Sequence, residues 1–242
     1  MSNFLSGPVQ VVAQTLHSSS ADQMHKLGEL VFANDGRAFR YSLAGATAYV
    51  AGNTYTSQDE DTDTQNLTAV AAAIGDLTIA STSTVTVTAN EYAEGFILIA
   101  VTPGIGRNYK IKGHIAYTTA APTFNLDNDP VVVALTTGSR LDALANPFRS
   151  TVVAGTSTVC PVVGVAVHAV VAAEYGWLQV LGTAVVEAEG TVTVGLPVVR
   201  SETDAGTVEE IADAANELRQ VVGAAQTGIA DGEFGAVKLS LL

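Results

Sequence analysis

The chain contains few of the residues on which several functional classes depend. Lysine and arginine together number 11, against 24 aspartates and glutamates, so the formal charge at pH 7 is −13. Nucleic-acid binding uses clustered Lys and Arg to displace phosphate counterions, so this composition argues against a nucleic-acid partner. A single cysteine, Cys160, excludes an intrachain disulfide. It lies in the apolar run 158–162, which favours a small buried side chain over a nucleophile.

Long apolar runs are also missing. No stretch approaches the roughly 20 residues that a membrane-spanning helix needs. Residues 1–5 lack the basic and apolar regions of a secretory signal peptide. We therefore expect synthesis in a cytoplasm and no membrane partner.

Motifs that identify common enzymes are absent as well. No Gly-x-Ser-x-Gly nucleophile elbow occurs. Gly104 and Gly106 begin like a dinucleotide-binding fingerprint, but Tyr109 stands at the third glycine position, so the segment is interpreted as a turn. We predict that the protein is not an enzyme and binds no cofactor.

Four histidines are scattered along the chain: His17, His25, His114 and His168. None has Cys or carboxylate partners at metal-ligand spacing. His17 and His25 could share a metal near the N-terminus, but solvent exposure is the favoured interpretation. His168 lies among valines, and we expect it on a strand, facing water or donating to a carbonyl.

An acidic run resembles the start of a calcium loop. Asp59, Asp61 and Asp63 have the first three ligand spacings. Thr64 replaces the sharp-turn glycine and Val70 replaces the bidentate glutamate, so the pattern favours a solvated loop over a cation site. We predict no metal site.

Thr, Val and Gly are abundant, and this balance favours strands and turns over long amphipathic helices. The predicted fold class is all-β, a sandwich or barrel core of short antiparallel strands with an inserted β-rich subdomain and at most one or two short helices. An Asn34-Asp35-Gly36 turn predicts a hairpin between residues 28–32 and 37–41. Further strands are expected at residues 84–88, 96–101 (buried on both faces), 109–112 and 131–135.

Helical patterns are few. Helical spacing of apolar residues predicts a helix within 208–218. Residues 141–144 are interpreted as one helical turn, and residues 67–74 as either a short helix or a strand.

Two stretches in the C-terminal part of the chain repeat each other. VVGVA at residues 162–166 recurs as VVGAA at 221–225, 59 positions later, and EYG at 174–176 recurs as EFG at 233–235 with the same offset. Alternating apolar residues follow each triplet, so both copies predict strand, turn, strand. A chain that repeats a β-hairpin and shows no catalytic motif is typical of a structural module.

Residues 1–26 form a predicted N-terminal arm. Its apolar residues include Phe4, Leu5, Val9, Val11 and Val12. Two interpretations carry equal weight: an arm that ties one subunit to another, and a simple edge strand or frayed terminus.

Trp177 follows a turn and alternates with Gln179. An outward Trp177 could bind a sugar or a protein partner. A packed side chain with its indole N–H hydrogen-bonded is the favoured interpretation.

The order of short motifs resembles the head decoration, or cement, proteins of tailed bacteriophages. The motifs are GRAFRY at residues 36–41, AGA at 44–46, AG at 51–52, AEGF at 93–96, DPVVVAL at 129–135, NPF at 146–148, VGVA at 163–166, YGWLQV at 175–180 and RQVVG at 219–223. Each motif is weak alone, and their order over residues 27–242 carries the resemblance.

The resemblance implies a β-rich, non-catalytic virion protein that decorates the capsid surface, commonly as a homotrimer, and bridges neighbouring capsomers. Its expected partner is the major capsid protein, and the predicted contacts with the capsid or a neighbouring subunit are Phe4, Leu5, Val9, Val11 and Val12. Shorter relatives look like the two ends of this chain joined directly. This implies an arm at 1–26, a core from 27–54 plus 148–242, and an insert at 55–147. The alternative is a head-fibre or tail-associated protein that binds a receptor or carbohydrate.

Overall fold

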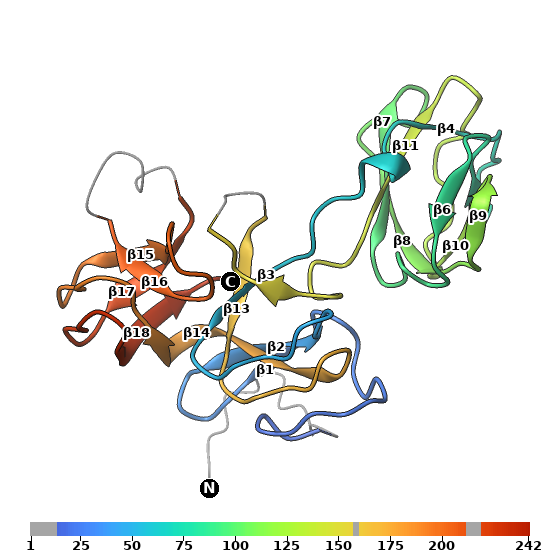
Figure 1. Cartoon of the computed structure of the whole chain (residues 1–242). Helices are drawn as coiled ribbons and strands as arrows, with labels where there is room; N and C mark the ends of the chain where they lie inside the picture. The colour runs from blue at the N-terminus through green and yellow to red at the C-terminus, as the bar shows by residue number, and fades with distance from the viewer. Residues whose placement is uncertain (1–13, 157–159, 212–218) are drawn as a thin grey trace, which may run out of the picture. The chain divides into compact units, whose positions relative to one another are not determined.

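The computed structural model describes residues 14–156, 160–211 and 219–242 (Figure 1). The protein is all-β, as the composition and turn signals predict. The one helical element among the described residues is a single 3₁₀ turn, η1 (Thr62–Thr64). The predicted contact residues Phe4, Leu5, Val9, Val11 and Val12 lie outside the described residues.

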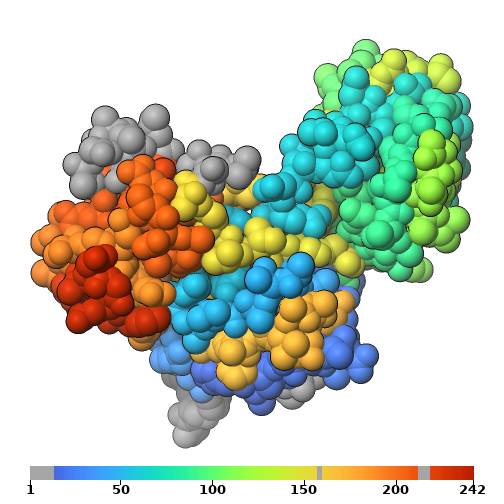
Figure 2. All heavy atoms as spheres, viewed as in Figure 1, coloured from blue at the N-terminus to red at the C-terminus, as the bar shows by residue number. Residues whose placement is uncertain are grey.

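The chain divides into two compact units, each with its own core. Unit 1 comprises residues 1–59 and 147–242, and unit 2 comprises residues 60–146. In Figure 2, unit 2 is coloured from cyan through green to yellow. The insert boundary expected at residue 55 cuts through a strand of unit 1, because Tyr55 and Thr56 pair within its sheet.

Unit 1 is one ten-stranded antiparallel sheet. The main path runs β12-β3-β13-β14-β18-β17-β15-β16, and the β1–β2 hairpin joins β14 through β2. Its strands are β1 (Leu30–Phe32), β2 (Ala38–Leu43), β3 (Thr54–Thr56), β12 (Val152–Val153), β13 (Val162–Ala166), β14 (Tyr175–Glu187), β15 (Pro197–Arg200), β16 (Val208–Glu210), β17 (Val221–Ala225) and β18 (Phe234–Ser240). The β1–β2 pairing confirms the predicted hairpin.

Unit 2 has a six-stranded sheet, in the order β4-β11-β7-β8-β10-β5, and a two-stranded sheet, β6-β9. Its strands are β4 (Leu67–Thr68), β5 (Thr78–Ala80), β6 (Val85–Val87), β7 (Phe96–Val101), β8 (Asn108–Gly113), β9 (Tyr117–Ala120), β10 (Thr123–Leu126) and β11 (Arg140–Leu144). Fully buried Ile79, Ile97, Ile111, Phe124 and Leu141 form the centre of its core.

The two echoed segments fold as the repeated hairpins that the sequence predicts. β13 pairs with β14 through Val165 and Gln179, and β17 pairs with β18 through the counterparts Ala224 and Lys238. Both hairpins keep the 59-residue offset, which confirms the prediction.

The repetition extends further than the sequence echo. β3 pairs with β13 through Thr54 and Val165, and β15 pairs with β17 through Pro197 and Ala224. Both pairings have a register shift at the same place. β12 adds to β3 as β16 adds to β15. Unit 1 therefore contains two structural repeats, a first repeat of residues 38–59 with 147–181 and a second repeat of residues 182–242.

The long strand β14 belongs to both repeats. Its first half pairs with β2, matching Trp177 with Tyr41, and its second half pairs with β18, matching Val185 with Ala236. Gly182, with φ +84°, lies where the halves meet. A backbone in the left-handed region favours glycine, so the passage from one repeat to the other depends on this residue.

Unit 2 interrupts the first repeat at a defined position. It lies in the connection from β3 to β12, whose counterpart in the second repeat is the short turn 201–207 between β15 and β16. Unit 1 also has two cores. The first contains Phe39, Tyr41, Tyr49, Tyr55 and Trp177 of the first repeat. The second is built from valine, alanine, leucine and isoleucine, mostly of the second repeat, with Ala154, Val162 and Val165 added from the first.

Several predicted elements need correction in unit 2. β7 is a strand, but its burial alternates, with Ile97 and Ile99 buried and Phe96 and Leu98 only half-buried, because the core covers one face of the sheet. Residues 141–144 belong to strand β11 and not to a helical turn, since pairing with β7 fixes an extended backbone. The 67–74 alternative resolves as a short strand, β4.

Residues 131–135 do not form the predicted strand. Val131 and Leu135 are buried, while Val132 is 51% exposed. The backbone N–H groups of Val131 and Leu135 donate to the carbonyls of Asp76 and Ala72, so residues 131–135 pack against the loop that contains residues 72–76. Residues 84–88 and 109–112 do contain the predicted strands β6 and β8.

The helix predicted within 208–218 is wrong at its start. Val208, Glu209 and Glu210 form strand β16 and pair with β15. The apolar residues of this stretch have helical spacing, but its first three residues form backbone hydrogen bonds with the edge of β15, and this pairing fixes an extended backbone. Residues 212–218 lie outside the described residues.

Candidate functional site

The described part of the N-terminal arm packs over the aromatic residues of the first repeat. Gln14 is buried and connects to three of them. The Trp177 indole N–H donates to the Gln14 carbonyl at 3.3 Å, and the Tyr41 hydroxyl donates to Gln14 Oε1 at 2.7 Å. Gln14 Nε2 donates to the Tyr175 carbonyl at 2.9 Å. The His25 ring lies 5.1 Å from that of Trp177.

Trp177 is therefore an inward side chain. It is 1% exposed and its N–H is hydrogen-bonded, which confirms the favoured interpretation. Residues 14–28 cover this aromatic group, so Trp177 offers no sugar-binding surface.

The corresponding surface of the second repeat has no such cover among the described residues. By register, Val185 corresponds to Tyr41, Phe234 to Tyr175 and Ala236 to Trp177. Val185 is 59% exposed and Phe234 is 53% exposed. We call Val185, Phe234 and Ala236 the open face.

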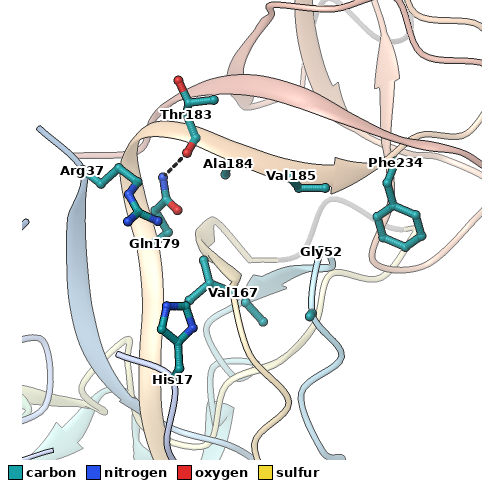
Figure 3. Close-up of a pocket in the computed structure, with 11 residues that line it drawn as sticks. His17, Arg37, Gly52, Val167, Gln179, Thr183, Ala184, Val185 and Phe234 are labelled. Carbon is teal, nitrogen blue, oxygen red and sulfur yellow. Dashed lines mark hydrogen bonds between the residues drawn. The ribbon is translucent and has the colours of Figure 1, made fainter. Parts of the chain in front are cut away.

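A pocket of about 490 Å³ adjoins the open face (Figure 3). It is lined mainly by apolar groups, and Val185 and Phe234 form part of its wall. Its remaining lining residues are His17, Arg37, Ala51, Gly52, Ala166, Val167, Gln179, Thr183 and Ala184. The pocket therefore joins the open face to residues of the first repeat and of the arm.

Gln179 gives this pocket a buried hydrogen-bond acceptor. The residue is 1% exposed, and its Nε2 donates to the carbonyls of Leu181 at 3.1 Å and Thr183 at 2.9 Å. These two carbonyls fix the amide orientation. Gln179 Oε1 has no partner among the described residues, and an unpaired buried acceptor is costly.

Arg37 on the pocket wall is already partly neutralised. Its Nε donates to Asp35 Oδ2 at 2.8 Å, and its guanidinium lies 5.5 Å from the centre of the Phe39 ring. The hydrogen bond from the Arg37 backbone and the guanidinium charge lower the pKa of Asp35. The pocket is therefore mainly apolar.

The histidines have separate surroundings. His25 Nδ1 lies 3.2 Å from Glu29 Oε1, whereas His17 packs beside His168 with ring centres 6.4 Å apart. His168 lies at a bend after β13 and not on a strand. His114 is buried, and its two ring nitrogens contact the Tyr92 N–H and the Ile115 carbonyl. In the described part of the chain, no group of three His, Cys, Asp or Glu residues could hold a metal.

The acidic run caps a turn. Asp61 Oδ1 accepts from the Asp63 backbone N–H at 2.9 Å, and Asp61 Oδ2 accepts from the Tyr92 hydroxyl at 3.2 Å. Asp59 Oδ1 lies 3.3 Å from Cys160 Sγ. Burial, and then the hydrogen bond to Asp59, raise the pKa of the Cys160 thiol, so the thiol is not activated. Cys160 is half-buried, less buried than the sequence predicts.

A pair of carboxyl groups at β16 was not predicted. Glu209 is 7% exposed. Burial, and then a hydrogen bond with Glu189, raise the pKa of Glu209 to about 7, while the pKa of Glu189 is lowered. Glu189 Oε2 also accepts from Ser201 at 3.0 Å, and Arg219 Nη1 lies 4.0 Å from Glu209 Oε1. The one signal of this pair in the sequence is the doublet Glu209-Glu210. Adjacent residues of a strand point to opposite faces of the sheet, so one of two consecutive glutamates must face the core.

This pair predicts a pH-dependent stability. Near pH 5, folded Glu209 holds a proton that the unfolded chain, with a pKa near 4.5, has released. Unfolding then releases a proton, so the free energy of unfolding should fall as the pH rises to about 7. We expect a loss of about 2–3 kcal/mol in urea denaturation between pH 5 and 7.5.

The matched variant is Glu209→Gln, which keeps the shape and the donor to Glu189 but cannot ionise. Its stability should change less over this range, and the difference between the two pH profiles isolates Glu209 from the histidines. Parallel profiles would contradict the prediction.

Comparisons with known proteins add no relative: no family model, curated protein or solved structure matches the chain. Within the described residues, no helix has the length and apolar character needed to cross a bilayer.

Proposed function

We propose that the protein is a tailed-bacteriophage head decoration protein that stabilises the capsid by bridging neighbouring capsomers, without catalysis. One observation carries the proposal. A single chain holds two separately cored β units, and each displays exposed apolar side chains. A bridge needs at least two contact surfaces, and this architecture supplies them.

Unit 2 has the features of a contact module. It occupies a connection whose counterpart is only the turn 201–207, so the repeat does not need it to close its sheet. Ile74, Ile105 and Ile115 lie outside the strands and are 69%, 63% and 69% exposed. The three residues lie in different loops, so unit 2 presents separate exposed apolar side chains that are available for contact with another protein.

The proposed partner is the major capsid protein, with the protein located on the capsid surface after synthesis in the host cytoplasm. A homotrimer would engage several capsid sites at once, and later contacts then form at high effective concentration. Residues Phe4, Leu5, Val9, Val11 and Val12 remain proposed contacts with the capsid or a neighbouring subunit.

Counting copies per particle tests the proposal. Quantitative mass spectrometry of purified virions should find this chain at hundreds of copies, comparable with the number of capsomer contacts. A few copies per virion, or none, would overturn the decoration role.

Ile105 offers a site-directed test. It lies at the tip of the β7–β8 hairpin, in the turn that residues 103–106 predict. Ile105→Asp should weaken capsid attachment at least about tenfold in a co-sedimentation titration, because the aspartate carboxylate would lose its bound water when the hairpin contacts the capsid. The melting temperature should stay unchanged, since the side chain is not in the core.

Thr84→Asp is the matched control, because it adds the same charge at another exposed position of unit 2. Equal attachment of both variants and the unchanged protein would exclude this hairpin from the interface.

A head-fibre or tail-associated receptor-binding protein is the second candidate. A hollow of about 720 Å³ in unit 2 favours it, since Asn90, Lys112, Asn125 and Asn128 supply polar groups to its lining. Binding to a glycan array, together with a low copy number per virion, would select this alternative.

A further inference from the structure

The first repeat of unit 1 has an extra strand partner at the start of its second hairpin strand. Ser20 of the arm forms an antiparallel bridge with Tyr175. The Tyr175 N–H donates to the Ser20 carbonyl at 2.8 Å, and the Ser20 N–H donates to the Tyr175 carbonyl at 3.1 Å. The Ser19 hydroxyl donates to Glu174 Oε2. The arm therefore satisfies both backbone groups of Tyr175 and the neighbouring carboxylate.

The second repeat has the same strand edge. The Glu174 carbonyl accepts from the Ala44 N–H at 2.9 Å, and its counterpart, the Glu233 carbonyl, accepts from the Ala188 N–H at 3.0 Å. In an antiparallel ladder, this bond places the residue after each glutamate in a non-hydrogen-bonded pair with the adjacent strand. The N–H and carbonyl of Phe234 therefore point away from β14, towards the opposite edge.

That opposite edge is open beside Phe234. Two residues further on, the Ala236 N–H donates to Thr227 Oγ1 and the Ala236 carbonyl accepts from the Gln226 N–H, on the β17 side. β17 ends before it reaches Phe234, and among the described residues no group pairs with the Phe234 N–H or carbonyl. Glu233 is exposed and has no hydrogen-bond partner in the described ranges either. The edge therefore offers a donor, an acceptor and a carboxylate.

The arm shows which kind of segment fits such an edge. It is an extended backbone that carries a side-chain donor, the Ser19 hydroxyl, one residue before the paired residue Ser20. Directly opposite residues of antiparallel strands place their side chains on the same face. A residue opposite Phe234 would therefore lie on the open face, beside the exposed side chains of Val185 and Phe234 (Figure 3). An apolar side chain suits this position, because it removes apolar surface from water.

Charge at the edge selects the donor and argues against a second copy of the chain. Glu187 lies opposite Phe234 on β14, and Asp231 and Glu233 precede Phe234 in the turn, so the edge is acidic. The chain carries 24 acidic and 11 basic residues, so a second copy would bring further negative charge. A lysine or arginine in the place of the serine hydroxyl would donate to Glu233 and also neutralise charge.

We propose that the strand edge at Phe234 binds an extended segment of another protein, in which a basic residue precedes an apolar residue. The apolar residue exchanges two backbone hydrogen bonds with Phe234 and covers Val185, and the basic residue pairs with Glu233. The inference goes beyond the proposed function, because this chemistry defines the partner whether or not it belongs to a capsid.

NMR titration of the isotope-labelled protein with the peptide acetyl-Thr-Val-Lys-Val-Thr-amide tests the proposal. Before peptide is added, the Phe234 amide should exchange with solvent at least about tenfold faster than the Tyr175 amide, which is bonded to Ser20. At roughly 5 mM peptide, the amide signals of Glu233 and Phe234 should shift, and exchange at Phe234 should slow.

Two changes isolate the proposed contacts. N-methylation of the valine after lysine removes the N–H that would donate to the Phe234 carbonyl, and should weaken binding at least about fivefold. Glu233→Gln removes the partner of the lysine, and should weaken binding about two- to fivefold. Glu60→Gln is the matched control, because it removes the same charge at an exposed position of unit 2, and it should leave binding unchanged.

Several results would overturn the proposal: slow exchange at Phe234 in the free protein, no shift at Phe234 with peptide, or equal binding of the N-methylated peptide. Shifts at Phe234 that grow with protein concentration alone would instead assign the edge to a second copy. The titration uses no virion, so its failure leaves the copy-number test of the proposed function unaffected.

Discussion

Gly164→Ala and Gly223→Ala should each destabilise unit 1 by about 2–3 kcal/mol. These glycines hold the same position in the two repeated hairpins. A Cβ at Gly164 would lie 2.6 Å from Leu178 Cβ, and one at Gly223 would lie 2.9 Å from the Lys238 carbonyl carbon and closer to its oxygen. These neighbouring atoms are backbone or Cβ atoms of hydrogen-bonded strands, so they cannot move aside as the end of a flexible side chain could.

Urea denaturation followed by tryptophan fluorescence measures this effect. The chain has one tryptophan, Trp177, in the first repeat, so the signal reports unit 1 and not unit 2. Gly228→Ala is the matched control, because its Cβ would make an ordinary 3.8 Å contact with the Val192 carbonyl oxygen. If all three variants unfold at the same urea concentration, close packing of the hairpins does not require glycine.

Trp177→Ala should be the most damaging single truncation in the first repeat. The side chain is 1% exposed and packs against Tyr41 and His25. Its removal leaves a cavity and also removes the donor to the Gln14 carbonyl, so we expect a loss of about 3–5 kcal/mol by circular dichroism. Hydrogen exchange should accelerate in residues 14–28, because their hydrogen-bonded contact is lost.

Trp177→Phe separates the two contributions. It keeps most of the apolar volume but cannot donate to Gln14, so its stability loss should be smaller while exchange in the arm still rises. Val221→Ala, a truncation at a half-exposed position, sets the scale for a surface change. A Trp177→Ala loss no larger than that of Val221→Ala would contradict the proposed packing of the arm.

Local patterns in the sequence predicted much of the secondary structure. The Asn34-Asp35-Gly36 turn, the alternation in residues 84–88 and the two echoed hairpins all appear in the structure. These signals are short-range, because turn backbone preferences and side-chain alternation depend on adjacent residues. The segments that were wrong, 131–135, 141–144 and the start of 208–218, have apolar patterns that fit more than one element.

The complete repeat could not be predicted in this way. β3 and β15 share no sequence motif, yet Thr54 and Pro197 hold equivalent positions in their sheets. Backbone hydrogen bonds preserve such a register while the side chains change. The family resemblance implied an insert at residues 55–147, but nothing in the sequence indicated that its counterpart is a seven-residue turn at 201–207.

The candidate site was predicted only in part. The sequence singled out the apolar residues of the arm and an inward Trp177. It did not indicate the open face, the unpaired Gln179 Oε1 or the raised pKa of Glu209. Each of these depends on residues far apart in the chain, such as Glu189 with Glu209 and Gly52 with Phe234.

The sequence by itself determined the all-β class, the repeated hairpins and the net charge of −13, because these follow from composition and neighbouring residues. The tertiary structure alone decided which of two equivalent faces is covered. That choice depends on where the chain leads after each strand: residues 14–28 lie over the first repeat, and no described segment lies over the second.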